Sequence, residues 1–205
     1  MKLYDSRRAP NPRRVRWLLA EKGVTDIEIV QIDILKNEHR DPAFLDRAGL
    51  ANLPALEMDD GTVITESLAI GRYLESVYPD PNLFGHDPKE TAVIEMWTRR
   101  AEMLLATPLM LAVRHAHPAL AALEQQAPEI AATNRAGAER ALKLFDRRLS
   151  ESAFMAADRI TMADIVAFVG LDFARMVQFK APEALTHFTR WADAMRARPA
   201  ATAGV

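Results

Sequence analysis

The sequence has 205 residues, of which 49% are hydrophobic, and this is enough to build a core in one large or two small domains. Its 26 basic and 28 acidic residues give a formal net charge of −2, which provides no electrostatic reason to expect nucleic-acid binding. Cysteine is absent, so disulfides, thiolate metal sites and a protein thiol nucleophile are excluded. The chain shows no apolar signal core and no apolar stretch of membrane-spanning length. We therefore expect a cytoplasmic protein that does not enter a membrane.

Strand and helix patterns alternate at the start of the chain. Short runs near residues 2–5 and 27–32 predict two strands, and helical spacing of apolar residues predicts a helix over 12–22 between them. Gly23 is a good C-terminal cap for that helix. After the second strand, Asp41 can cap a short helix that has proline in its first turn. The order of elements is βαβα.

A hairpin and a third helix complete the first part. The apolar runs 55–58 and 63–65 flank the turn residues 59–61, Asp-Asp-Gly, which predicts two antiparallel strands. Residues 67–77 then have the pattern of a helix. One mixed sheet covered by helices satisfies this order.

Only helices are predicted beyond a proline-bearing connection near residues 80–87. Long helices are expected over about 89–114 and 129–149. Thr161 and Asp164 form a capping box before a strongly apolar segment, which predicts a buried helix stabilised at its start. The fold class is therefore an α/β domain followed by an all-α helical bundle.

Two short motifs in the first part can hold a ligand that resembles an amino acid. Pro54 has no N–H, so Leu53 can present free backbone polar groups, and the bond between them can be cis. Glu66 and Ser67 stand where a helix begins, so its unpaired amides, its dipole and a hydroxyl can hold a carboxylate. The Glu66 carboxylate can pair with an amine. Together these groups fit an amino-acid headgroup.

The order of these motifs resembles a known family. With βαβ, then ββα carrying Leu-Pro and Glu-Ser, then a helical part with Thr-x-x-Asp, the chain resembles a bacterial-type cytosolic glutathione transferase over essentially its whole length. The resemblance implies a thioredoxin-like glutathione-binding domain over 1–80 and an all-helical electrophile-binding domain over 88–205. It also implies a homodimer, a role in detoxification and glutathione as co-substrate. The expected reaction conjugates glutathione to small hydrophobic electrophiles.

The loop after the first strand departs from the family pattern. The resemblance aligns Ala9 with the position where serine classes keep the hydroxyl that stabilises the glutathione thiolate. Asn11 is the best remaining candidate, since a Thr-Pro-Asn run occupies this place in a bacterial class that reduces disulfides with glutathione. Asn11 can equally be a helix cap. Ser6 is the second candidate for the thiolate, and it can instead be an ordinary strand-terminal serine.

The resemblance also assigns the remaining site residues. Leu53 would pair with the cysteinyl part, Pro54 would set the loop, and Glu66 with Ser67 would bind the γ-glutamyl end. Asn52 and His39, with Lys36 as an alternative, are candidates for the glycine end. The residues assigned to glutathione are Asn11, His39, Asn52, Leu53, Pro54, Glu66 and Ser67.

The electrophile cleft is expected along the first long helix of the second part. Arg100 and Met103 are its candidates there, with Arg8 from the loop after the first strand. Most other members of the stripe that contains Trp97 and Leu104 are expected to be core. Residues 115–118, His-Ala-His-Pro, suit a helix-end turn better than a metal site, and we expect no metal.

Two alternative functions remain open at the level of sequence. Glutathione-dependent disulfide reduction is suggested by the Ala9-Pro10-Asn11 run and by the absence of cysteine. A non-catalytic ligand-binding or regulatory protein of the same fold is suggested by the missing hydroxyl at Ala9. The intact Leu-Pro and Glu-Ser pairs favour an enzyme.

Overall fold

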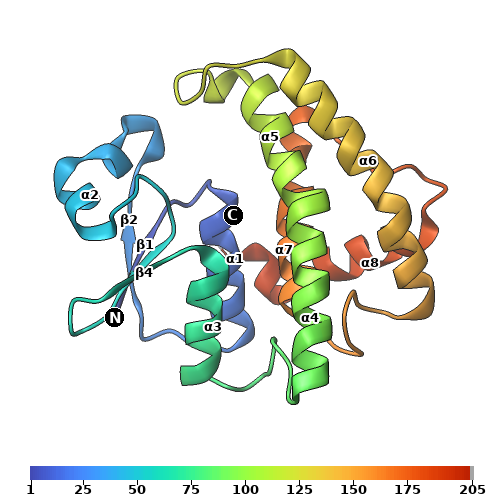
Figure 1. The fold of residues 1–205 in the computed structure, drawn as a ribbon, viewed down its shortest axis with the longest axis horizontal. Helices are drawn as coiled ribbons and strands as arrows, with labels where there is room; N and C mark the ends of the chain where they lie inside the picture. Colours follow the sequence, from blue (N-terminus) through green and yellow to red (C-terminus); the bar gives the residue numbers. More distant parts are fainter. Residues whose placement is uncertain (204–205) are drawn as a thin grey trace. The chain divides into compact units, whose positions relative to one another are not determined.

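The protein divides into two compact units. The structure, a computed structural model, describes residues 1–203. One unit consists of Met1–Pro81 together with the described chain end from Thr202, and the other is Asn82–Ala201. In Figure 1 the first unit runs from blue to teal, and the second from green to red.

The first unit is a small mixed sheet with helices on its faces. Its strands are β1 (Lys2–Asp5), β2 (Glu28–Gln31), β3 (Ala55–Glu57) and β4 (Val63–Thr65). Its helices are α1 (Pro10–Glu21), the 3-10 turns η1 (Ile34–Lys36) and η2 (Glu38–Arg40), α2 (Pro42–Ala48) and α3 (Ser67–Val77). The strand order is β2-β1-β3-β4, in which β1 and β2 are parallel and the other pairs are antiparallel. This arrangement confirms the predicted thioredoxin-like fold.

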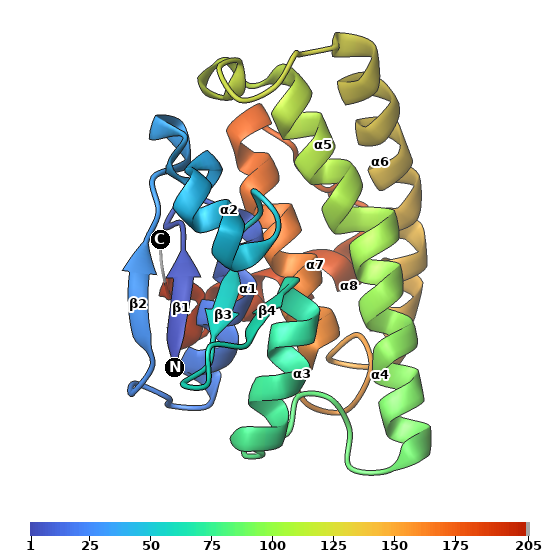
Figure 2. The ribbon, with the colours of Figure 1, turned by 60° about the vertical axis from the view of Figure 1, so that its left-hand side comes forward.

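Side chains that alternate along the strands build a core on both faces of the sheet. Tyr4 and Ala55 face each other across β1 and β3 and pack with Phe44 of α2. The neighbouring pair, Leu3 and Leu56, is fully buried and points to the opposite face because successive strand residues alternate. Helices α1 and α3, which contact each other, cover that face (Figure 2).

Local signals placed most elements of this unit correctly. Helix α3 has the predicted bounds, and Asp41 caps α2 by accepting a hydrogen bond from Ala43 N at 2.8 Å. Gly61 has φ +84° in the β3–β4 turn. The predicted strands 27–32 and 55–58 are shorter in the structure, since only 28–31 and 55–57 meet ladder partners.

The predicted start of α1 was wrong. The helix begins at Pro10 rather than at about Pro12, and its N-cap is Ala9, which has an extended backbone and no side-chain cap. The fixed φ of proline suits the first helical position, so Pro10 can open the helix without a capping side chain. Asn11 therefore lies inside the first turn and does not cap the helix.

The second unit contains helices only. They are α4 (Pro88–Arg100), the π-helix η3 (Ala101–Ala106), α5 (Thr107–Ala116), η4 (Pro118–Leu120), α6 (Pro128–Glu151), α7 (Met162–Phe173), η5 (Ala174–Val177) and α8 (Thr186–Arg196). A final 3-10 turn, η6, spans Pro199–Thr202. Helix α7 packs against α4 and η3, and α6 packs against α5 and α8. In Figure 1, the upper half of α6 runs beside α5.

The capping box predicted at the start of α7 is present and is part of a larger network. Thr161 N–H and its hydroxyl donate to Asp164 Oδ2 at 3.0 and 2.9 Å. Met155 N–H and Trp191 Nε1 donate to Asp164 Oδ1, each at 2.9 Å. Asp164 is fully buried, and this burial raises its pKa against the lowering effect of these hydrogen bonds.

The single helix predicted over 89–114 was wrong in one respect. Residues 101–106 form a π-helix between α4 and α5, and the extra residue in its turns rotates everything that follows relative to α4. Leu104 is consequently 42% exposed, although it was expected to be core, while Trp97 is buried as expected. Gly170 of α7 packs against this segment so closely that an added Cβ would lie 2.5 Å from Ala106 Cα.

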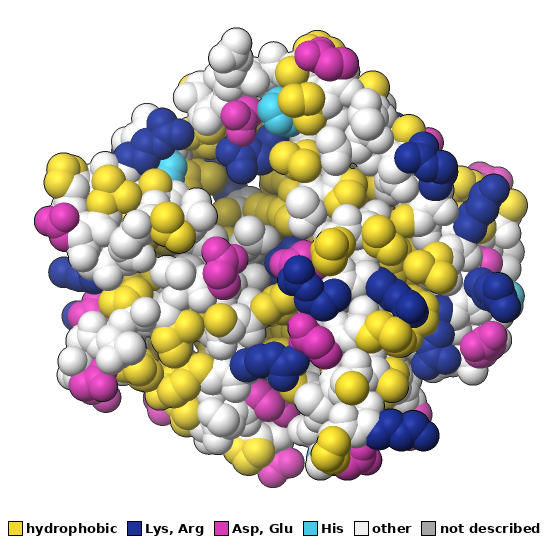
Figure 3. All heavy atoms as spheres, in the orientation of Figure 1, with side chains coloured by type: hydrophobic (Ala, Val, Ile, Leu, Met, Phe, Trp, Pro, Cys, Tyr) yellow, Lys and Arg dark blue, Asp and Glu magenta, His cyan; other side chains and the backbone are white. Residues whose placement is uncertain are grey.

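The surface is mixed in character. On the face shown in Figure 3, basic, acidic and apolar side chains are interspersed. Within residues 1–203, no helix combines the length and apolarity needed to cross a membrane.

Candidate functional site

One edge of the small sheet gathers most of the predicted site residues. Strand β3 runs antiparallel to β1 with Ala55 opposite Tyr4, so the residues that follow β1 lie beside those that precede β3. Ala55 also faces Thr65 of β4, which brings Leu53 and Pro54 close to the start of α3. Because β2 is parallel to β1, the segment after β2 leaves at the same edge. The chain segments that carry Asn11, His39, Leu53 and Glu66 therefore meet there.

The first turn of α1 offers hydrogen-bond groups without internal partners. Pro10 and Pro12 have no N–H. The Arg13 N–H bonds to the Ala9 carbonyl at 3.3 Å. The Asn11 N–H makes no hydrogen bond to any residue that the structure describes, and Asn11 Oδ1 is buried without a partner. Backbone and side chain of Asn11 are thus both available at the positive end of the helix dipole.

Ser6, the second candidate for stabilising the thiolate, lies among contacts that hold the backbone of its loop. Ser6 is buried, and its carbonyl accepts hydrogen bonds from Ala9 N at 2.9 Å and Arg16 Nη1 at 3.3 Å. Arg16 also pairs with Asp5, which is fully buried and accepts a 2.6 Å hydrogen bond from Gln31 Nε2. This polar cluster fixes the loop that connects β1 to α1.

Leu53 presents its backbone in the way the sequence suggests. The Leu53–Pro54 peptide bond is cis. Neither the N–H nor the carbonyl of Leu53 bonds to another residue within 1–203. Its side chain packs on the cluster of Tyr4, Phe44 and Ala55, which holds the backbone in place. Both polar groups are therefore fixed and available to a ligand that pairs like a strand.

The start of α3 is open. Glu66 is the N-cap residue, with φ +66° and ψ +117°, and no side chain caps the helix. Such a backbone is strained for any residue other than glycine and is concentrated at functional sites. The Glu66 carboxylate is exposed and makes no ion pair within the described part of the chain. Unpaired amides and a free carboxylate thus stand side by side.

Arg14 is a site residue that sequence reasoning missed. It is buried, and its Nη1 donates to Ser67 Oγ at 3.3 Å, which connects α1 to the start of α3. It is not among the residues predicted from the sequence. Its position four residues before the buried Leu18 places it on the core-facing stripe of α1, and this spacing could have identified it.

The candidates for the glycine end differ in their surroundings. His39 lies in η2, and its Nδ1 is buried without a hydrogen-bond partner. Burial, and secondarily the charge of Arg40, lowers the pKa of His39, so its neutral form is favoured. Asn52 is exposed, and Lys36 forms a 3.4 Å ion pair with Asp33. His39 is therefore better prepared than Lys36 to meet a ligand.

The candidates for the electrophile side belong to different units. Arg8 is exposed in the loop after β1 of the first unit and makes no ion pair within residues 1–203. In the second unit, the Arg100 guanidinium lies 4.7 Å from the centroid of the Trp97 ring, and Met103 is 59% exposed in the π-helix. Stacking on an aromatic ring holds a guanidinium while leaving its N–H groups available.

The two histidines near the end of α5 have structural roles. His117 Nδ1 accepts a hydrogen bond from Ala119 N, and His115 Nδ1 accepts one from Ala127 N, both at 3.3 Å. Both therefore tie together the turn between α5 and α6. Among residues 1–203, no group of three or more potential ligands is arranged to hold a metal ion.

The described part of the chain thus combines a thioredoxin-like domain, which has an open helix start beside a Leu-Pro turn, with an all-helical domain. The sequence model described as glutathione S-transferase, N-terminal domain, matches residues 1–76, and that of the C-terminal domain matches residues 101–199. Glutathione S-transferase 2 of Saccharomyces cerevisiae is 37% identical over 202 residues, which cover 97% of this chain and 87% of that protein.

Solved structures give the same result. A glutathione S-transferase domain-containing protein from Marinobacter aquaeolei superposes with a TM-score of 0.92 at 39% identity, covering 98% of this chain and 100% of that one. Gtt2 from Saccharomyces cerevisiae also has a TM-score of 0.92, at 36% identity and with all of both chains covered. The chain therefore belongs to the glutathione S-transferase family.

Proposed function

We propose that this protein conjugates glutathione to small hydrophobic electrophiles. One observation carries the proposal: at a single edge of the sheet, polar groups of Asn11, Leu53 and Glu66 lack hydrogen-bond partners within residues 1–203. Buried or fixed polar groups are normally paired, so a concentration of unpaired ones indicates a place for a ligand. Glutathione supplies a peptide backbone, an amine and carboxylates that suit these groups.

Each part of glutathione has a candidate partner. The backbone of Leu53, held in place by Pro54, would pair with the cysteinyl residue of glutathione. The amine of the γ-glutamyl end would meet the Glu66 carboxylate, and its carboxylate would meet the amides and hydroxyl at Ser67. His39 and Asn52 would contact the glycine end. In this role Arg14, which donates to Ser67 Oγ, is a positioning residue.

The protein's chemical task is to favour the thiolate of glutathione over the thiol. A free thiol has a pKa of about 8.5, and each unit of lowering requires about 1.4 kcal/mol of preferential thiolate stabilisation. Asn11 would supply this through its N–H at the start of α1 and through its side-chain Nδ2, which can donate a hydrogen bond to the sulfur. Ser6 is the second candidate, because its hydroxyl follows β1 at the same edge.

Each unit, taken by itself, carries candidates for electrophile binding. We propose that Arg8 of the first unit and Arg100 and Met103 of the second contribute to its binding. An exposed methionine adapts to apolar molecules of varied shape, and a ring-stacked guanidinium can hold a polar substituent. Residues 1–80 would then form the glutathione-binding domain and 88–205 the electrophile-binding domain.

Membership of the family supports a proposal about the setting of the enzyme. We propose that the protein is a cytoplasmic homodimer that acts in detoxification and needs no metal. Sedimentation equilibrium would test the dimer, with a single species of twice the chain mass as the expected result. Activity retained after prolonged dialysis against a chelator would test the independence from metal.

The decisive experiment compares wild type with Asn11→Ala and Ser6→Ala. Each is assayed with glutathione and an aryl halide, an epoxide and a mixed disulfide, and glutathione affinity is measured by calorimetry. We expect Asn11→Ala to keep its affinity and lose about 10- to 100-fold in turnover, because it removes a donor to the developing or existing thiolate. The ultraviolet absorbance of bound thiolate, followed against pH, should shift to higher pH in this variant only.

Other outcomes separate the alternatives. Loss of turnover in Ser6→Ala alone would transfer the role to Ser6. Turnover of the mixed disulfide alone would indicate disulfide reduction, and glutathione binding without any turnover would indicate a non-catalytic binding protein, although the family relatives favour neither. Absence of glutathione binding would overturn the proposal.

A further inference from the structure

Arg16 connects helix α1 to the loop that precedes it. Its side chain is only 10% exposed. Its Nη1 pairs with the carboxylate of Asp5 and also donates to the Ser6 carbonyl at 3.3 Å, while its Nη2 donates to the Arg7 carbonyl at 3.0 Å. Because the guanidinium is planar and its donors have fixed directions, this one group holds three successive residues of the loop at set positions relative to α1.

The carboxylate that pairs with Arg16 is itself held by the sheet. Asp5 is the last residue of β1, and its side chain is fully buried. Its Oδ2 accepts a hydrogen bond from Gln31 Nε2 of β2 at 2.6 Å, and its carbonyl accepts one from Ile32 N at 2.7 Å. Both carboxylate oxygens therefore have partners, and the pair of Asp5 and Arg16 joins the sheet rigidly to α1.

The loop held by Arg16 leads to both candidates for stabilising the thiolate. Ser6 is one of them, and its carbonyl, to which Arg16 donates, also accepts a hydrogen bond from Ala9 N at 2.9 Å. Ala9 is the N-cap of α1, and its carbonyl accepts a hydrogen bond from Arg13 N at 3.3 Å. Asn11, the other candidate, lies in this first turn. A series of hydrogen bonds thus runs from Arg16 to the start of α1.

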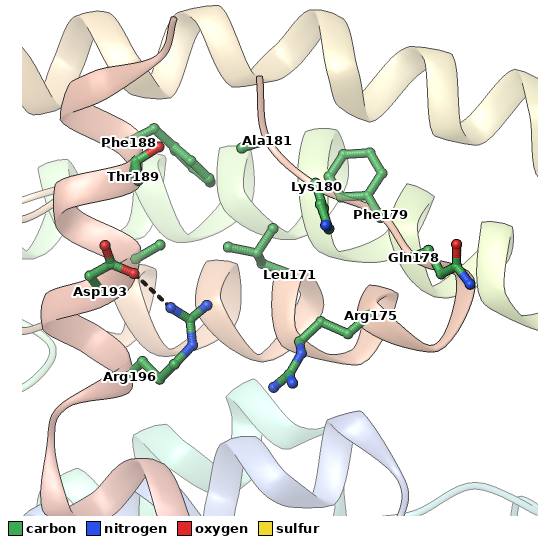
Figure 4. A pocket seen from close by; sticks show the side chains of 11 residues that line it. Leu171, Arg175, Gln178, Phe179, Lys180, Ala181, Phe188, Thr189, Asp193 and Arg196 are labelled. Atoms are coloured by element: carbon green, nitrogen blue, oxygen red, sulfur yellow. Dashed lines mark hydrogen bonds and ion pairs between the residues drawn. The ribbon is translucent and has the colours of Figure 1, made fainter. Parts of the chain in front are cut away.

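Another pair of arginine and aspartate shows what is particular to Arg16. Arg196 and Asp193 of α8 pair at 2.7 Å (Figure 4), and their side chains are 49% and 66% exposed. Such a surface pair adds little to stability. The buried pair of Arg16 and Asp5 also adds little net stability, because the cost of removing two charges from water offsets their attraction. It differs from the surface pair in that it fixes the loop before α1.

We propose that Arg16, held by Asp5, is a positioning residue that aims the hydrogen-bond donors at the start of α1 toward the sulfur of bound glutathione. This inference rests on the proposed function. Arg16 acts through the loop, by keeping Asn11 and Ser6 where a donor of either residue meets the thiolate. Donors that are already in place stabilise a charge much better than donors that must first be ordered. Ionisation of the thiol, and with it turnover, therefore depends on a residue that does not touch the ligand.

Arg16→Lys tests this role while keeping the positive charge. A lysine can still pair with Asp5, but its ammonium does not reproduce the planar fork that also holds the carbonyls of Ser6 and Arg7. With glutathione and an aryl halide at neutral pH, kcat should fall about tenfold, while the KM for glutathione stays within about twofold. The ultraviolet absorbance of the bound thiolate, followed against pH, should shift to higher pH by about one unit.

Arg159→Lys is the matched control. The Arg159 guanidinium also joins several groups, since it donates to Glu90 Oε2 at 3.1 Å and to the Asn82 carbonyl at 3.2 Å, but it belongs to the helical unit. This variant should lower the midpoint of thermal unfolding and leave the pH profile of the bound thiolate unchanged. If Arg16→Lys does not fold, the double variant Asp5→Asn with Arg16→Gln removes both charges, keeps a polar pair and should show the same shift.

The outcomes separate this inference from the proposed function. A folded Arg16→Lys with wild-type kcat and an unchanged thiolate profile would overturn the inference and leave the proposed function intact. An equal shift in Arg159→Lys would also overturn it, because loosening of the fold would then be sufficient. If wild type binds glutathione as the thiolate but conjugates no electrophile, the proposed function fails, and the absorbance of the variants still decides the role of Arg16. Absence of glutathione binding by wild type would overturn both.

Discussion

Helices α3 and α7 begin with similar polar residues, but their starts are organised in opposite ways. At α7, the carboxylate of Asp164 receives hydrogen bonds from Thr161, Met155 and Trp191, and no part of it is exposed. At α3, no side chain caps the helix, and the carboxylate of Glu66 is exposed and not ion-paired within the described residues. The carboxylate at the start of α7 thus stabilises its own helix, whereas the amides and the carboxylate at the start of α3 have no such use within the protein.

This difference separates a structural helix start from a functional one. At α7 the acid closes on its own helix and ties it to α8 through Trp191. At α3 the acid sits in a strained backbone, and the hydroxyl of Ser67 accepts a hydrogen bond from Arg14. Unsatisfied helix starts bind anions, so the open one is where a ligand carboxylate belongs. The start of α4 resembles that of α7, because Asp87 Oδ1 accepts a hydrogen bond from Glu90 N of the helix, and Glu90 Oε2 accepts one from His86 N just before it.

The largest expected loss of stability comes from removing the hydrogen-bond network around Asp164. Asp164→Ala should lower the free energy of unfolding by about 3–5 kcal/mol, because it leaves buried N–H groups of Met155, Thr161 and Trp191 without acceptors. Urea denaturation measures this. The control is Asp158→Ala, at an aspartate whose side chain is 95% exposed, and it should change stability by less than about 0.5 kcal/mol. If Asp164→Ala lowered the free energy of unfolding by less than about 1 kcal/mol, the start of α7 would not be the structural helix start described above.

A substitution of Glu66 at the start of α3 should change glutathione affinity and leave the stability of the protein unchanged. Glu66→Gln keeps the shape of the side chain and removes its charge, so glutathione affinity should fall about tenfold through loss of the pair with the ligand amine. The midpoint of thermal unfolding should stay within experimental error. Glu28→Gln, at an exposed glutamate of β2, should leave both quantities unchanged. A stability loss without an affinity loss in Glu66→Gln would show that Glu66 is structural.

Relieving the backbone strain at Glu66 should raise the free energy of unfolding, by less than Asp164→Ala lowers it. Glu66→Gly should raise the free energy of unfolding by about 1 kcal/mol, because glycine adopts φ +66° without the steric cost that glutamate pays. Glu66→Ala keeps the strain and should show no such gain. Urea denaturation of the pair measures the difference. Equal stability of the two variants would mean that the backbone relaxes when the side chain is shortened.

Sequence signals were sufficient for elements governed by local chemistry. The bounds of α3 follow from the Asp-Asp-Gly turn before it and from helical spacing after it. The placement of Leu53 and Glu66 at one edge follows from the register of β3 with its neighbours. The positive φ of Glu66 could not be predicted, because glutamate rarely adopts it and only the surrounding fold imposes it.

The elements that depend on distant packing were missed. The π-helix 101–106 leaves no mark in the spacing of apolar residues, and it lies where Gly170 of α7 comes into close contact with Ala106. Arg14 was not among the predicted site residues, although its spacing to Leu18 places it on the buried stripe. Tertiary contact, which a single sequence does not display, accompanies the π-helix, whereas the burial of Arg14 was visible in its helical spacing.

The smallest expected effect concerns the third helix start, at α4. Hydrogen bonds from Arg159, and then from His86 N, lower the pKa of Glu90 from 4.5 to about 2. A lowered carboxylate pKa stabilises the fold above the unfolded value and loses that contribution as pH falls from 4.5 toward 2. Glu90→Gln should therefore cost about 1 kcal/mol or less at pH 7, since the pair is partly exposed, and the cost should shrink steadily below pH 4.5.

Urea midpoints of wild type and Glu90→Gln, taken at intervals between pH 7 and pH 2.5, measure this convergence. The same comparison in an Arg159→Gln background should show a weaker pH dependence, because the main cause of the lowered pKa is then gone. A difference between the two proteins that stays constant over the whole range would mean that the Glu90 carboxylate contributes by its shape and not by its charge. The start of α4 would then depend on the hydrogen bonds that Glu90 accepts from Arg159 and His86 and not on its charge.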